Sequence, residues 1–181
     1  MKLSFRDYPF LLLVAGSIVA LDQWTKSIVR ANLPLGSTWL PEGWEWLSPY
    51  ARILHWYNTG AAFGLFKNGA ILFSILAIVI SVLIIIYFPR IEAGNWWLRV
   101  AMSMQLGGAV GNLISRVTMS GRVTDFISLG TFPVFNVADS SITIGTIILL
   151  LGMWLKERQL KRDQVTQAQN RGANNGGKES E

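Results

Sequence analysis

The stretch AILFSILAIVISVLIIIYF, residues 70–88, decides the fold class of this chain. It has 19 residues and no charged side chain, and at about 1.5 Å per residue it nearly crosses a hydrocarbon core of about 30 Å. Pro89 and Arg90 end it. The whole chain of 181 residues is 51% hydrophobic and only 15% charged, whereas soluble domains are about a quarter charged. These features predict a membrane protein.

Three other stretches, on either side of this one, are predicted to be further spans. Residues 9–29 are apolar as far as Leu21. The third span is only weakly apolar and contains Gly107 and Gly111, whose spacing allows another helix to approach closely. We therefore expect a mainly α, polytopic membrane protein with four transmembrane helices, at about 9–29, 70–88, 96–115 and 138–155.

The two ends of the chain need separate interpretation. The N-terminal pattern of basic and then apolar residues is similar to that of a signal peptide, but no clear cleavage site follows it, so we interpret it as an uncleaved first span. One membrane-embedded domain is expected over residues 1–158. The polar residues 159–181, rich in Asn, Gly, Gln and Lys, are predicted to form a disordered cytoplasmic tail.

The distribution of basic residues predicts the orientation. Four spans put both termini on one side, and that side carries more Lys and Arg than the other, which favours cytoplasmic termini. Residues 31–69 and 116–137 then lie outside. Both have β character, in RILHWYN (52–58) and GRVTDFISLGTFPVFN (121–136), and the tryptophans of the first suit a membrane interface. We expect a small extracytoplasmic β element, followed in NTGAAFGLF (58–66) by a turn and a short amphipathic piece.

Polar residues from distant parts of the chain fall at one depth under this assignment. Asp22 lies about 20 Å along the first span, and Lys26 lies one turn further out on the same face. Ionisable groups inside a membrane are costly and are functional by default. The residues expected at this level of the outer leaflet are Asp22, Lys26, Asn112, Arg116, Asp125, Asn136 and Asp139.

Most of these residues also have a simpler structural explanation. Asp139, which precedes two serines, could be a helix N-cap. Asp22 and Lys26 could be an ion pair that reaches the interface. Asn112 and Arg116 could tie a helix end to its loops. The gathering of all these residues at one level nevertheless favours a functional site.

The residue inventory limits the chemistry of such a site. The chain has no Cys and a single His, which excludes disulfides and thiolate sites and disfavours a Ser-His-Asp triad or a His-rich metal site. Two neighbouring carboxylates are the natural remaining catalytic pair. They cannot both ionise, so the ionised one takes a proton from water and the protonated one donates to the scissile carbonyl. A helix N-terminus favours negative charge, so we expect Asp139 to be ionised.

Five motifs resemble the successive motifs of bacterial lipoprotein signal peptidase, also called signal peptidase II: DQWTK (22–26), NTGAAF (58–63), GGAVGNLISR (107–116), GRVTDF (121–126) and FNVADSSI (135–142). The resemblance covers roughly residues 9–155. It implies a four-helix aspartyl endopeptidase with an outer β-cradle, which cleaves prolipoproteins before a diacylglyceryl-modified cysteine. It further implies a bacterial cell-membrane location, a site towards the extracytoplasmic face, and no metal or cofactor.

The resemblance also implies roles for single residues. Asp125 and Asp139 match the catalytic pair. Ser115 stands where the family usually has aspartate, so we expect Arg116 to be neutralised instead by Asp22 or by a member of the pair. The positions that match substrate-binding or site-organising residues are Asp22, Lys26, Asn58, Asn112, Arg116 and Asn136.

The expected partners are diacylglyceryl-modified prolipoproteins and membrane lipid, with no nucleic acid, and we expect a monomer. Three alternative functions make different demands on the sequence. A proton-coupled transporter would place carboxylates at several depths or show an internal repeat, and the sequence predicts neither. A presenilin-like protease would carry a GxGD motif, which does not occur. A non-catalytic lipoprotein-binding relative stays open because of Ser115.

Overall fold

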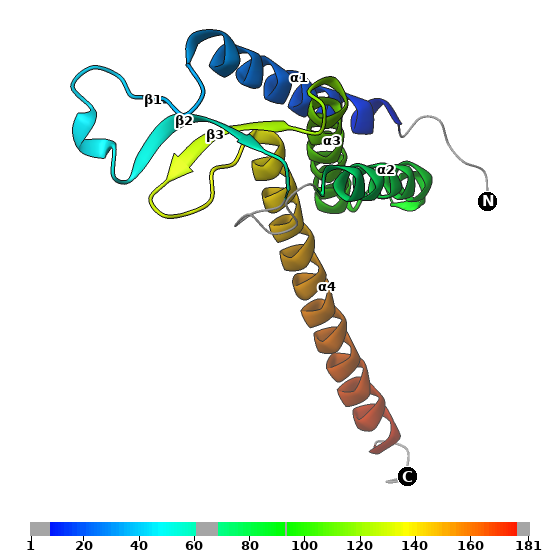
Figure 1. Ribbon diagram of the computed structural model, residues 1–181. Helices are drawn as coiled ribbons and strands as arrows, with labels where there is room; N and C mark the ends of the chain where they lie inside the picture. Colours follow the sequence, from blue (N-terminus) through cyan, green and yellow to red (C-terminus); the bar gives the residue numbers. More distant parts are fainter. Residues whose placement is uncertain (1–7, 61–68, 93, 177–181) are drawn as a thin grey trace.

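The computed structural model describes residues 8–60, 69–92 and 94–176, with side chains described as far as residue 164. Long helices form a bundle, and a small sheet lies at one end of it (Figure 1). The mainly α architecture predicted from the sequence is confirmed. The helices are α1 (Tyr8–Asn32), α2 (Ala70–Tyr87), α3 (Trp96–Thr118) and α4 (Val137–Gly176), with short 3₁₀ helices η2 (Glu45–Leu47) and η4 (Phe88–Arg90).

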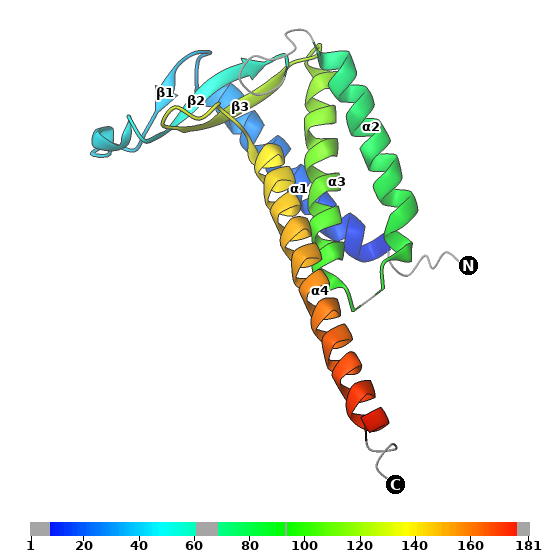
Figure 2. The ribbon, with the colours of Figure 1, turned by 90° about the horizontal axis from the view of Figure 1, so that it is seen from below.

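The central helix is α3, which packs against α1, α2 and α4 (Figure 2). Glycines make this close packing possible, as the Gly107 and Gly111 spacing predicted. A Cβ atom at Gly107 would lie 2.8 Å from Ile18 Cβ of α1. A Cβ atom at Gly108 would lie 2.5 Å from the carbonyl oxygen of Ala138 in α4. These glycines therefore bring α1 and the first turn of α4 against α3.

Within the part of the chain that the structure describes, three helical segments are long and apolar enough to cross a membrane: Tyr8–Asn32, Ala70–Arg90 and Val137–Gln164. Such segments indicate a membrane-embedded protein. The helix predicted at 96–115 is present as α3, but α3 is not among the three candidates. It buries polar side chains such as Ser103 and Asn112 inside the bundle, and these lower its hydropathy.

The sheet joins the two segments that were predicted to have β character. Its three antiparallel strands are in the order β1-β2-β3. Asp125 of β3 pairs with Trp56 of β2, and Asn58 follows two residues after Trp56. Since residues two apart on a strand share a face, Asn58 and Asp125 lie on the same side of the sheet. The strands are β1 (Thr38–Trp39), β2 (Ala51–Asn58) and β3 (Val123–Leu129).

The predicted small β element is thereby confirmed as an antiparallel sheet. The turn and amphipathic piece expected in NTGAAFGLF fall mainly on residues 61–66, which lie outside the described residues.

The last helix is much longer than the predicted span. It continues to Gly176 and projects away from the other helices (Figure 1). The prediction of a disordered tail is therefore wrong for residues 159–176, which are helical. This segment contains four Gln, two Arg and two Ala, which favour helix, and the Glu157–Lys161 ion pair, 2.6 Å long, supports its start. Residues 177–181 lie outside the described part of the chain.

Burial changes in character along the bundle. At the end away from the sheet, the core consists of apolar side chains from α1, α2, η4 and α3, including Leu11, Ile84, Phe88 and Leu106. Towards the sheet the buried side chains become polar and charged. Because buried polar groups are stable only when they are hydrogen-bonded, this end must contain a connected network.

Candidate active site

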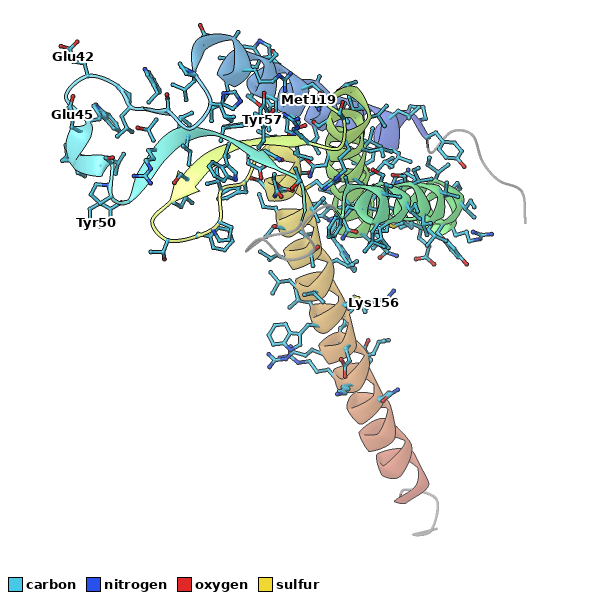
Figure 3. The ribbon with its side chains drawn as sticks, viewed as in Figure 1. Glu42, Glu45, Tyr50, Tyr57, Met119 and Lys156 are labelled. Atoms are coloured by element: carbon cyan, nitrogen blue, oxygen red, sulfur yellow. The ribbon has the colours of Figure 1, made fainter. Side chains whose placement is uncertain are left out.

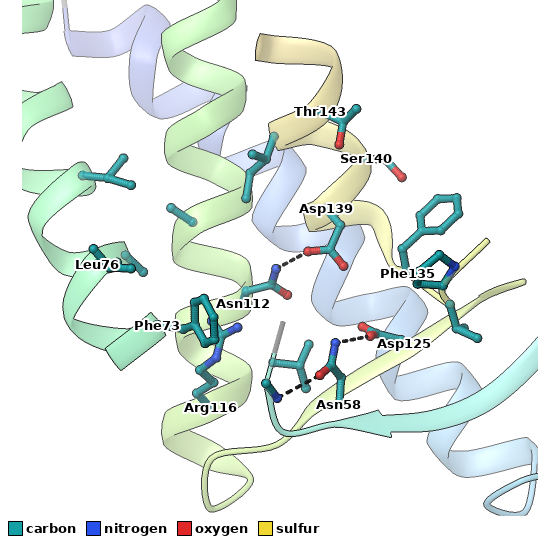
Figure 4. Close-up of a pocket in the computed structure, with 18 of the residues that line it drawn as sticks. Asn58, Phe73, Leu76, Asn112, Arg116, Asp125, Phe135, Asp139, Ser140 and Thr143 are labelled. Carbon is teal, nitrogen blue, oxygen red and sulfur yellow. Dashed lines mark hydrogen bonds between the residues drawn. The ribbon is translucent and has the colours of Figure 1, made fainter. Parts of the chain in front are cut away.

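The polar network begins at the first turn of α4 (Figure 4). Asn136 directly precedes this helix, and its Oδ1 accepts a hydrogen bond from the backbone N–H of Asp139 at 3.0 Å. In return, Asp139 Oδ2 accepts from the backbone N–H of Asn136 at 3.3 Å. This reciprocal arrangement is a capping box. The cap of α4 is therefore Asn136, and the explanation of Asp139 as the N-cap is wrong.

Asp125 lies on β3, and its side chain also contacts Asn136. Its Oδ1 accepts from Asn136 Nδ2 at 2.6 Å, and its Oδ2 accepts from Asn58 Nδ2 at 3.0 Å. Asn58 is held in turn, because its Oδ1 accepts from the backbone N–H of Gly60. Asn136 therefore connects the two carboxyl groups: its amide nitrogen binds Asp125, and its amide oxygen binds the backbone of Asp139.

Asp139 is also held from α3. Its Oδ1 accepts from Asn112 Nδ2 at 2.7 Å. The Oδ1 of Asn112 accepts two hydrogen bonds, from Lys26 Nζ at 2.9 Å and from Asn136 Nδ2 at 3.2 Å. Both donors fix the orientation of the Asn112 amide, so that its nitrogen points to Asp139.

The environment of Asp125 disfavours its ionised form. Burial, and after it the negative charge of Asp139, raise the pKa of Asp125 to about 7, although hydrogen bonds from Asn58 and Asn136 and the charge of Lys26 act in the opposite direction. Near neutral pH, Asp125 can therefore carry a proton beside a second carboxyl group. One proton shared over two carboxylates is the requirement for general acid–base catalysis by such a pair.

Behind this pair lies a fully buried ion pair on α1. Lys26 Nζ lies 2.8 Å from Asp22 Oδ2, and both side chains have an exposed fraction of 0%. The other oxygen of Asp22 accepts from the backbone N–H of Ala138 at 3.0 Å. A Cβ atom at Gly111 would lie 2.9 Å from Asp22 Oδ2, so this glycine makes room for the carboxylate. The ion pair thus reaches both residues that flank Asp139: Ala138 along α4 and Asn112 across from it.

Arg116 makes no direct ion pair with the carboxylates that were expected to neutralise it. Among the described residues it forms no such contact with Asp22 or with either member of the carboxyl pair, although the negative charges of Asp139 and Asp125 act on its guanidinium at longer range. Asp22 is already paired with Lys26. The guanidinium of Arg116 instead lies over the ring of Phe73 on α2, 5.5 Å from its centroid (Figure 4).

A cavity of about 680 Å³ opens beside the two carboxyl groups. Asp125, Asp139 and Arg116 contribute to its polar end. The rest is mostly apolar and comes from α2, α3, α4 and the segment that precedes α4, including Phe73, Leu76, Ile80, Phe135, Ile142 and Ile144. The site therefore combines two neighbouring carboxyl groups with a mostly apolar wall, in a cavity of the size that small-molecule and peptide ligands occupy. Over the described residues, no three His, Asp or Glu side chains form a group that could hold a metal ion.

The predicted polar residues thus lie in one cluster, but two further members were missed. Gln23 donates from Nε2 to Asp22 Oδ2 and to the carbonyl oxygen of Gly111, both at 2.9 Å. Ser115 was treated as a neighbour of Arg116, yet its Oγ accepts from Lys26 Nζ at 3.2 Å. The spacing could have indicated this, since Asn112 and Ser115 are three apart and therefore share a face of α3.

Comparisons with known proteins agree on one family. Residues 14–155 match the family model described as signal peptidase (SPase) II. The chain is 41% identical over 155 residues to a lipoprotein signal peptidase of Shouchella clausii, with 83% of this chain and 96% of the relative covered. It is 34% identical over 151 residues to that of Enterococcus faecalis, with 82% and 90% covered.

The fold is similar to that of solved structures described as bacterial membrane enzymes determined by the in meso method. The one at 2.3 Å resolution superposes with a TM-score of 0.73 at 32% identity and covers 81% of this chain and 88% of the other. The one at 1.9 Å resolution gives a TM-score of 0.69 at 33% identity, with 79% and 91% covered.

Proposed function

The chain belongs to the signal peptidase II family of aspartic endopeptidases, which remove signal peptides from prolipoproteins, and we propose that Asp125 and Asp139 are its catalytic pair. The observation that carries this proposal is that the two carboxyl groups, Asp125 buried and Asp139 partly buried, are held on either side of Asn136 and line the same cavity. A relay of carboxylates at several depths, as a transporter would need, is not favoured, because Asp22, Asp125 and Asp139 belong to one cluster.

The chemistry follows from one proton on the pair. Asp139, at the N-terminus of α4, is ionised and takes a proton from a water molecule as the water oxygen attacks the scissile carbonyl carbon. Protonated Asp125 donates its proton to the carbonyl oxygen, which gives a neutral tetrahedral intermediate. Collapse of the intermediate breaks the C–N bond, the leaving nitrogen takes a proton from Asp139, and Asp125 regains its own.

Other cluster residues hold the pair or meet the substrate in this proposal. Asn58, Asn112 and Asn136 donate hydrogen bonds to the two carboxyl groups, while Asp22 and Lys26 support them from α1. Arg116 faces the cavity and is suited to bind a carbonyl oxygen of the peptide. The apolar wall from α2 and α4 would take the lipid chains and the signal helix of a prolipoprotein whose cysteine is diacylglyceryl-modified. The proposed unit is a monomer without a cofactor.

The proposal is tested with purified protein in detergent and two matched peptides. One carries a diacylglyceryl-modified cysteine after the cleavage site, and the other carries the same cysteine unmodified. We expect release of the signal peptide from the first and little from the second, because only the first can fill the apolar wall. Absence of cleavage of the modified peptide, or equal cleavage of both, would contradict the proposed substrate.

The proposed topology has four spans, formed by α3 together with the three apolar helical segments. Both termini are cytoplasmic, and the carboxyl pair lies towards the extracytoplasmic side. A full-length helix α3 between three apolar helices supports it. We expect a cysteine introduced at Gly172 to react with an impermeant thiol reagent only after the membrane is opened. A cysteine introduced at Glu42, between β1 and β2, should react in intact cells. Reversed labelling of the two positions would rule this topology out.

A further inference from the structure

The hydroxyl group of Ser115 is a buried member of the polar network, with 1% of the residue exposed. Its Oγ donates to the carbonyl oxygen of Gly111 at 3.2 Å and accepts from Lys26 Nζ at 3.2 Å. Gln23 Nε2 approaches the same oxygen at 3.3 Å. A hydroxyl has one donor and two acceptor sites, so Ser115 is fully engaged between α1 and its own helix.

Ser115 completes the coordination of Lys26. An ammonium group has three N–H donors, and those of Lys26 point to Asp22 Oδ2, Asn112 Oδ1 and Ser115 Oγ, at 2.8, 2.9 and 3.2 Å. With all three donors engaged, the ammonium is fixed where it binds the oxygen of Asn112. The nitrogen of Asn112 is consequently directed at Asp139.

We propose that Ser115 is a positioning residue for the peptidase reaction: it locks the Lys26 ammonium in the place from which Lys26 orients Asn112 towards Asp139. This inference rests on the proposed function, since it assumes that Asp139 takes part in catalysis. Ser115 itself touches neither carboxyl group of the pair.

Position 115 also sets the charge behind the pair. The charged groups that face this region are Asp22 and Lys26 of α1, Arg116 of α3, Asp125 of β3 and Asp139 of α4. Because Ser115 is neutral, Asp22 is the single carboxylate that touches Lys26 among the described residues. The Lys26 charge lowers the pKa of Asp125, so a second carboxylate at position 115 would offset that charge and raise this pKa further.

The first test compares two alanine variants on the same helix. Ser103 is a matched control, because it is fully buried and its Oγ also donates to the carbonyl oxygen four residues earlier, that of Arg99. Ser103 lies away from the carboxyl pair. With the lipid-modified peptide, we expect Ser115→Ala to lower kcat about ten-fold with KM unchanged, and Ser103→Ala to keep the wild-type kcat. Ser115→Thr, which retains the hydroxyl, should recover part of the loss.

The second test is the pH dependence of kcat/KM for wild type and Ser115→Asp. We expect the whole bell-shaped profile of Ser115→Asp to move to higher pH by about one unit, because one added negative charge acts on both carboxyl groups through a partly shielded interior. Ser115→Ala should leave the pH profile unchanged within the error of measurement, because this substitution changes no charge.

Three results would overturn the inference. They are a wild-type kcat for Ser115→Ala, equal losses of kcat in Ser115→Ala and Ser103→Ala, and superimposable pH profiles for Ser115→Asp and wild type. If Ser115→Asp does not fold, the comparison of kcat between Ser115→Ala and Ser103→Ala decides whether Ser115 is a positioning residue. Failure of the proposed function would look different, because wild type would then not cleave the lipid-modified peptide at all.

Discussion

Asp125→Asn and Asp139→Asn are each expected to lower the rate of prolipoprotein cleavage by about 10³-fold or more. Loss of one general acid or base alone typically costs 10²- to 10⁴-fold, and here the proton of one member depends on the charge of the other. Asn is nearly isosteric with Asp but cannot carry both protonation states. The change at Asp125 also removes the group whose pKa burial raises to about 7. The measurement is single-turnover cleavage of the lipid-modified peptide.

A matched carboxyl-to-amide control is available far from the site. Glu42 lies exposed in the loop between β1 and β2, at the edge of the molecule (Figure 3). Glu42→Gln should cleave at the wild-type rate. Both active-site variants should purify as folded protein with unchanged helix content by circular dichroism. Near wild-type turnover in either variant would remove that aspartate from the mechanism.

Much of the fold could be predicted because its signals are local. The uncharged stretch 70–88 marks α2, and the β-branched and aromatic residues of RILHWYN mark β2. The end of α4 could not be predicted in this way. Its polar residues are compatible both with a solvent-exposed helix and with a disordered segment. Their composition alone therefore does not distinguish a projecting helix from a disordered tail.

The composition of the site could be predicted, but its connections could not. Depth along the spans brought Asp22, Asn112 and Asp139 to one level, and the structure joins them through hydrogen bonds. Which side chains form hydrogen bonds with one another depends on how each helix is rotated about its own axis. The depth of a residue along its span does not determine this rotation. Asn112 and Arg116 are an i,i+4 pair, a spacing that puts two side chains on one face of a helix, yet the Asn112 amide meets Lys26 while the Arg116 guanidinium meets Phe73.

The capping of α4 shows the same limit in another form. The sequence FNVADSSI offers two acceptors for the first turn, Asn136 and Asp139, and composition favours both. The structure uses both reciprocally, and this leaves Asp139 Oδ1 for Asn112. A helix start that satisfies its own backbone groups therefore also presents a carboxyl oxygen to the neighbouring helix.

The buried ion pair gives the largest expected effect on stability. Lys26→Met keeps the length of the side chain but leaves the Asp22 carboxylate buried with no cation in contact, and removing one partner of a buried pair typically costs about 3–5 kcal/mol. We therefore expect a clear fall in the unfolding temperature of Lys26→Met in detergent, together with loss of cleavage, because Asn112 loses the donor that orients it.

The double variant Asp22→Asn/Lys26→Met separates these two effects. Asn at position 22 can still accept from the backbone N–H of Ala138 and introduces no unpaired charge, so most of the lost stability should return while cleavage stays low. Lys161→Met is the matched control: its i,i+4 pair with Glu157 is exposed, at 72% and 63%, and its removal should leave the unfolding temperature unchanged. If Lys26→Met unfolds at the wild-type temperature, the pair does not support the site. If the double variant recovers cleavage along with stability, Lys26 acts through the fold alone and has no part in orienting Asn112.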